Sequence, residues 1–60
     1  MAGKNQQLLD IIDLVGQALN EARPYGLQIE VMASTIQRLQ KEPGVDLSVA
    51  LQDALRDWDL

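Results

Sequence analysis

The sequence predicts an all-α protein, a compact three-helix unit with helices at roughly 6–22, 27–42 and 47–58 that assembles into a helical dimer. Three observations lead to this prediction. Apolar residues recur every three or four positions in three segments, which is the period of a helix buried along one side. Proline and glycine stand close together at two points and divide the segments. The apolar residues are mainly Leu, Ile and Val, with one Trp, one Tyr and no Phe, a mix that suits interlocking helices better than a small β-barrel.

The length of the chain limits how it is stabilised. Sixty residues make one domain at most, and a chain of this size buries only about 60% of the surface that it exposes when unfolded. Small domains usually add disulfides, a metal or association, and this sequence has neither Cys nor His. We therefore expect a single helical domain over residues 1–60, with a flexible lead-in at residues 1–5, stabilised by close helix packing or by association.

The first helix is expected at about residues 6–22. Its apolar residues follow the 4-3-4 spacing of a helix packed lengthwise on another, and those expected in the core are Leu8, Ile12, Val15 and Leu19. Leu9 and Leu14 fall at opposite margins of this stripe and are expected to be partly exposed. Gly16 lies in the middle of the helix, at a cost of about 1 kcal/mol relative to Ala, and either lets a second helix approach closely or is simply tolerated.

The central helix, expected at residues 27–42, has two apolar faces. At about 100° per residue, one face is expected to join the core and contains Ile29, Met32, Ile36 and Leu39. Leu27, Val31 and Thr35 lie on nearly the opposite face, and a helix with two apolar faces needs two neighbours. The alternation of residues 27–31 also fits a strand, which would have to pair with a second copy, so both readings stay open for this stretch.

The third helix is expected at residues 47–58, after a type II turn with Pro43 and Gly44 at its centre. Its core residues are expected to be Leu51, Leu55 and Trp58. The large indole of Trp58 is expected to close one end of the core. Val49 falls outside the shared face of this helix.

Catalysis has little support in the residue types. Without His or Cys the chain lacks the usual general base near neutral pH, a thiolate nucleophile and an imidazole metal ligand. The carboxylates of the chain are expected on solvent-exposed helix faces. No loop pattern supplies the six or more oxygens of a hard-cation site. We expect no enzyme activity, no catalytic residue, no cofactor and no metal site.

The net charge of −4 bears on possible partners. An acidic chain gains nothing from counterion release on nucleic acid and is repelled by an anionic membrane surface. No apolar run approaches the length of a membrane span, and no apolar signal segment follows the first Met. We expect neither nucleic acid nor a membrane as partner, and a cytoplasmic location. A helix-turn-helix domain is the weakest alternative, because its last helix presents Asp53 and Asp57 to phosphates.

Apolar surface in excess of one small core predicts a protein–protein interaction module. Excess apolar surface with a polar rim is typical of association sites, and a twofold contact between identical chains is the commonest solution. The expected interaction surface consists of Leu27, Val31, Thr35, Leu9, Leu14 and Val49. We expect self-association through the central helix. The alternative is a small acidic inhibitor or adaptor that binds a different, basic protein.

Overall fold

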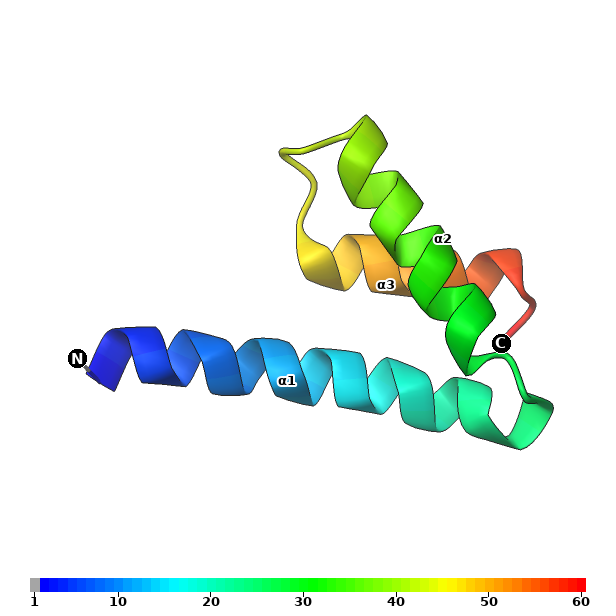
Figure 1. The fold of residues 1–60 in the computed structure, drawn as a ribbon, viewed down its shortest axis with the longest axis horizontal. Coiled ribbons are helices and arrows are strands. Elements are labelled where there is room, and N and C mark those ends of the chain that lie inside the picture. Colours follow the sequence, from blue (N-terminus) through cyan, green and yellow to red (C-terminus); the bar gives the residue numbers. More distant parts are fainter. Residues whose placement is uncertain (1) are drawn as a thin grey trace.

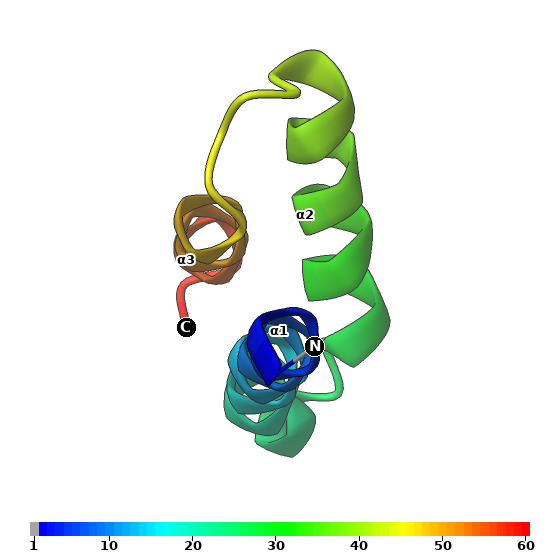
Figure 2. The ribbon, with the colours of Figure 1, turned by 90° about the vertical axis from the view of Figure 1, so that its left-hand side faces the viewer.

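The structure, a computed structural model, describes the backbone of residues 2–60 and the side chains of residues 6–60. Its elements are α1 (Ala2–Ala22), a short 3-10 turn η1 (Arg23–Tyr25), α2 (Gln28–Lys41) and α3 (Leu47–Asp57). The long α1 forms the base, α2 rises from its C-terminal end, and α3 runs behind α2 (Figures 1 and 2). The three predicted helices and the all-α class are confirmed, and no strand occurs in the described residues.

The ends of the helices differ from the expectation at two places. α1 begins at Ala2 rather than near residue 6, so residues 2–5 of the expected lead-in are helical, while Met1 lies outside the described residues. Leu27 is the N-cap of α2, and residues 28–31 are helical. The strand alternative for residues 27–31 is therefore wrong.

The first connection depends on a glycine. Gly26 has a φ of 69°, in the left-handed region that favours glycine, and its N–H donates to the carbonyl of Arg23 at 3.1 Å. The N–H of Leu27 donates to the carbonyl of Ala22, also at 3.1 Å. These two bonds stop α1 and turn the chain sharply into α2, so that α2 packs beside the end of α1.

The second connection is a four-residue turn in which the N–H of Val45 donates to the carbonyl of Glu42 at 3.0 Å. The prediction of a type II turn is wrong, because such a turn requires a positive φ at Gly44, and Gly44 does not have one. Asp46 is the N-cap of α3, and its side chain makes no capping hydrogen bond.

Small side chains make up most of the core. The buried residues are Ala18 and Ala22 of α1, Val31 and Thr35 of α2, and Ala50, Leu51 and Ala54 of α3. Alanines spaced four apart lie on one side of a helix, and Ala22 of α1 and Ala54 of α3 meet Val31 of α2 in one cluster. Close-packed interiors leave few voids, and short side chains therefore require the helices to approach closely.

The two faces of α2 are assigned the opposite way to the prediction. Val31, expected on the interaction surface, has an exposed fraction of 0%, while Ile29, expected in the core, is 81% exposed. The predictions for Val31 and Thr35 on one face, and for Ile29 and Ile36 on the other, are wrong. The physical reason is the close approach of α2 to the alanines of α3, which only the short Val31 and Thr35 fit. Thr35 also satisfies its hydroxyl locally, by donating to the carbonyl of Val31 at 2.8 Å.

The molecule is more extended than most chains of its size. Its radius of gyration is 11.9 Å, against about 10.4 Å for a typical 60-residue domain, and its extents are 37 × 26 × 14 Å. The cause is α1, whose 21 residues span about 31 Å at the rise of an α-helix and whose N-terminal part projects beyond α2 and α3 (Figure 1).

Candidate interaction surface

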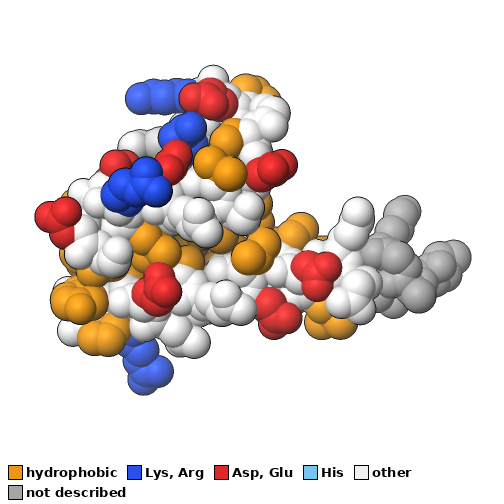
Figure 3. All heavy atoms as spheres, turned by 180° about the vertical axis from the view of Figure 1, so that it is seen from behind, with side chains coloured by type: hydrophobic (Ala, Val, Ile, Leu, Met, Phe, Trp, Pro, Cys, Tyr) orange, Lys and Arg blue, Asp and Glu red, His pale blue; other side chains and the backbone are white. Residues whose placement is uncertain are grey.

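The projecting part of α1 exposes a set of large apolar side chains. Every residue from Gln6 to Asp13, a segment called the arm below, is exposed. Leu8 and Ile12, expected in the core, are 59% and 62% exposed, and Leu9 and Ile11 are exposed as well. Seen from behind, acidic side chains on the arm have apolar ones above and below them (Figure 3). The arm is amphipathic, but its apolar side has no partner within the described chain.

The exposed apolar residues of the arm continue a stripe that extends into the body of the molecule. Leu8, Ile12, Val15 and Leu19 are called the α1 seam, and the helical period puts them within an arc of about 60°. Val15 and Leu19 are half-buried, and Leu8 and Ile12 are not. Ala18 and Ala22, which α1 uses within the chain, lie along one margin of the seam. The seam thus adjoins the surface of α1 that packs in the core, and its arm residues lie beyond that packing.

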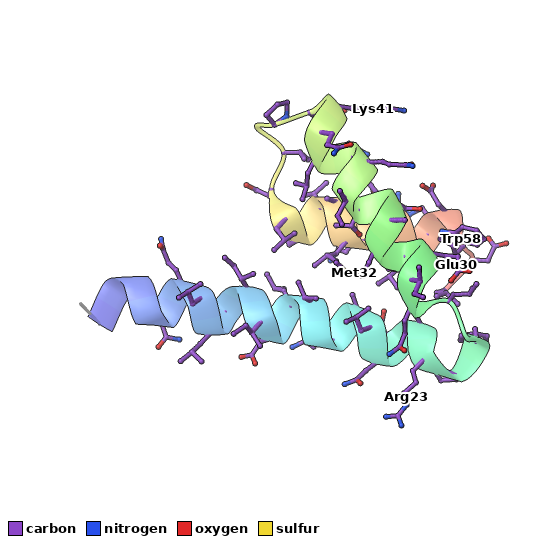
Figure 4. The ribbon with its side chains drawn as sticks, in the orientation of Figure 1. Arg23, Glu30, Met32, Lys41 and Trp58 are labelled. Atoms are coloured by element: carbon purple, nitrogen blue, oxygen red, sulfur yellow. The ribbon has the colours of Figure 1, made fainter. Side chains whose placement is uncertain are left out.

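The outer face of α2 lies next to the α1 seam. We use this name for Ile29, Met32, Ile36 and Leu39, of which Ile29 and Ile36 are exposed and the other two are half-buried. The side-chain amide of Gln28 donates to the carbonyl of Leu19 at 3.3 Å, so this side of α2 is turned toward α1. Met32 follows Gln28 by one turn, and Figure 4 shows it on the side of α2 that faces α1.

The exposed area of the chain is large for its mass. A folded monomer of 6.7 kDa is expected to expose about 3900 Å², whereas this chain exposes 4587 Å². The difference of about 700 Å² is close to the roughly 800 Å² that each partner contributes to a standard protein–protein interface. The chain thus exposes more surface than a compact monomer of its mass.

The residues predicted for the interaction surface do not lie together. Val31 and Thr35 are buried, and Leu27 is half-buried and packs against the core cluster. Leu14 is half-buried and lines a shallow groove between α1 and α3. Leu9 is exposed on the arm, while Val49 is exposed on α3.

Three of the predicted core residues come from the third helix and its end. Leu51 is buried, and Leu55 is half-buried against the core cluster, so both belong to the core. Trp58 is 41% exposed, and its indole Nε1 donates to the Ser34 hydroxyl at 3.1 Å. Trp58 therefore lies over the edge of α2, half in contact with solvent, rather than closing the core.

Charged side chains form a small network between α2 and α3. Arg38 contacts both Asp53 of α3 and Glu42 of its own helix, and Arg56 lies 3.9 Å from the other oxygen of Asp53. Arg23 and Lys41 instead point away from the body of the molecule (Figure 4). Arg38 and Lys41 line one groove together with Asp53 and Asp57, so acidic groups stand among these basic ones.

The hollows of the surface are small. One groove between α1 and α3 has a volume of about 120 Å³ and one between α2 and α3 about 150 Å³, below the roughly 300 Å³ at which small-molecule pockets begin. In the part of the chain that the structure describes, no three His, Cys, Asp or Glu residues are grouped to hold a metal ion. No helix of that part combines the length and the apolar character that crossing a membrane requires. The broad apolar surface is the most prominent candidate site.

Comparison of the chain with protein-family models, with curated proteins and with solved structures finds no match. Function is therefore inferred from the surface of this chain alone.

Proposed function

We propose that this chain is a non-enzymatic protein–protein interaction module that associates with a second copy of itself. The observation that supports the proposal most directly is the uncovered apolar surface formed by the α1 seam and the outer face of α2. Monomeric proteins rarely expose a contiguous apolar patch of more than a few hundred Å². Covering it with an identical surface on a second copy buries apolar area on both chains at once.

The proposal keeps the central helix in the interface but changes the face that it uses. Val31 and Thr35 are packed within the chain, so the part of the contact that lies on α2 is assigned to its outer face, where Ile29 and Ile36 are exposed. Their burial is worth about 25 cal/mol for each Å² of apolar area removed from water. Because binding also costs translational and side-chain entropy, the adjoining α1 seam has to contribute area as well.

A second candidate is an adaptor that presents this surface to a different protein. The acidic side chains of Asp10 and Asp13 on the arm favour it, since they follow the exposed Leu9 and Ile12 and would attract a basic partner. Such a protein would be a monomer on its own and would bind its partner more weakly as salt is raised.

The molar mass in solution tests the proposal. Light scattering behind a sizing column, repeated over a dilution series, should give twice the chain mass at high concentration. Ile12→Glu should give the mass of one chain with unchanged helicity, because the Ile12 side chain is exposed within the chain. Val49→Glu is the matched control, since Val49 is an exposed aliphatic residue on α3, and it should stay dimeric. A wild-type chain that is monomeric at every concentration would refute self-association and favour the adaptor.

A further inference from the structure

One residue of the α1 seam region has no role within the chain. Gly16 lies in the middle of α1, where a glycine costs about 1 kcal/mol relative to alanine. A Cβ added to Gly16 would meet no atom within 4 Å, and its φ is not in the left-handed region. Neither intrachain packing nor backbone conformation therefore requires a glycine here.

Gly16 is adjacent to the exposed apolar residues of α1. Residues i, i+3, i+4 and i+7 of a helix enclose the hollow that receives a side chain from a packed partner helix. On α1, Ile12, Val15, Gly16 and Leu19 form such a set. Because Gly16 adds no side chain, this hollow is deeper than its neighbours, and a second helix can come unusually close there.

We infer that the second copy packs its α1 antiparallel against the α1 seam, with Gly16 of each copy beside the point of closest approach of the two helices. This inference rests on the proposed self-association and specifies its geometry. A twofold axis between Ile12 and Val15 brings Leu8 of each copy opposite Leu19 of the other. The seam is symmetric about this point, since its 4-3-4 spacing reads the same in both directions.

The surroundings of the seam favour the antiparallel orientation. α2 begins beside the C-terminal end of α1 (Figure 2), so a parallel pairing would bring the α2 helices of both copies to the same end. In the antiparallel pairing, the arm of each copy instead packs on the half-buried part of the partner's seam. This places the arm beside the outer face of the partner's α2. The pairing thereby brings the seam and the outer face of α2 into one contact.

Substitution of Gly16 tests the place of contact. Gly16→Leu should raise the dissociation constant of the dimer by about tenfold to a hundredfold, as overpacking of a close contact does, without loss of helicity. Gln17→Leu adds the same side chain at the next position, which points away from the seam, and should leave the constant unchanged. If the wild type is dimeric and Gly16→Leu binds as tightly, the Gly16 contact is refuted while self-association stands. If the wild type is monomeric, both are refuted.

Cross-linking tests the orientation, and the chain has no cysteine of its own to interfere. Leu8→Cys and Leu19→Cys chains should be joined by a short bismaleimide when the two variants are mixed. Leu8→Cys alone should not be joined, because its two sulfurs would lie about 16 Å apart along the antiparallel helices. Efficient cross-linking of Leu8→Cys with itself, and none in the mixture, would indicate a parallel pairing and refute the inference.

Discussion

The guanidinium of Arg38 in α2 lies 2.6 Å from the carboxylate of Asp53 in α3, and this contact joins the two helices beside the core. The Nε of Arg38 is 3.3 Å from Glu42, but this pair lacks hydrogen-bond geometry and leaves the Nε without a hydrogen-bond partner. Asp53 is therefore the group that fixes the guanidinium. Both side chains are about one-third exposed, so solvent weakens the pair without abolishing it.

Asp53→Asn is expected to lower the free energy of unfolding by about 1 kcal/mol, between the values of exposed ion pairs and of hydrogen bonds to charged groups. Urea unfolding at a fixed protein concentration measures it as a lower midpoint with an unchanged slope. Asp57→Asn is the control, because Asp57 is exposed and has no ion pair among the described residues. Equal losses in both variants would show that net charge, rather than this contact, is responsible.

Val31→Glu is expected to unfold the chain, since it would place an unpaired carboxylate where no solvent reaches. Ile29→Glu makes the same chemical change two residues earlier, on an exposed side chain, and should leave the helix content unchanged. Far-ultraviolet circular dichroism distinguishes the two results directly. A folded Val31→Glu chain would mean that α2 does not pack on α3 through this face.

Gly26→Ala is expected to destabilise the fold by about 1 kcal/mol, because alanine is strained at the positive φ of Gly26. For a domain of this size the melting temperature should fall by about 4–8 °C. Gly44→Ala is the matched control: Gly44 has no positive φ and no neighbour that a Cβ would meet, so its melting temperature should be nearly unchanged. Similar falls in the melting temperatures of both variants would mean that the positive φ of Gly26 is not the cause of the destabilisation.

The melting temperature of the wild type is expected to rise with protein concentration, because association that involves only folded chains stabilises them by mass action. Differential scanning calorimetry over a hundredfold concentration range measures the shift. Ile12→Glu should melt at one temperature throughout the range, as a monomer does. A wild-type melting temperature independent of concentration would contradict self-association.

The periodicity of the sequence was sufficient to predict the three helices and the positions of both breaks. The spacing of Leu51 and Leu55 placed the core side of α3 correctly, because that helix has one main apolar face. The start of α1 was predicted too late, since the polar residues before Gln6 have no apolar period from which a helix can be read.

The face of α2 that packs within the chain could not be predicted in the same way. Both faces recur with the period of a helix, and this period alone does not show which face packs within the chain. The deciding factor is the partner: Ala50 and Ala54 let α3 come close, and close approach selects the shorter Val31 and Thr35. A single-sequence pattern shows that a face is apolar, but it does not show the size of the side chains opposite.

The alanines buried between the helices also determine which substitutions this fold tolerates. Ala22, Ala50 and Ala54 are almost completely buried, so replacing any of them with a larger residue forces a whole helix to move. In most proteins the large core residues tolerate substitution least. In this fold the buried alanines are the core residues that tolerate substitution least. In a chain without a partner, substitutions at the exposed aliphatic residues of the arm would cost little stability. Only a surface packed against these residues would select for their apolar character during evolution.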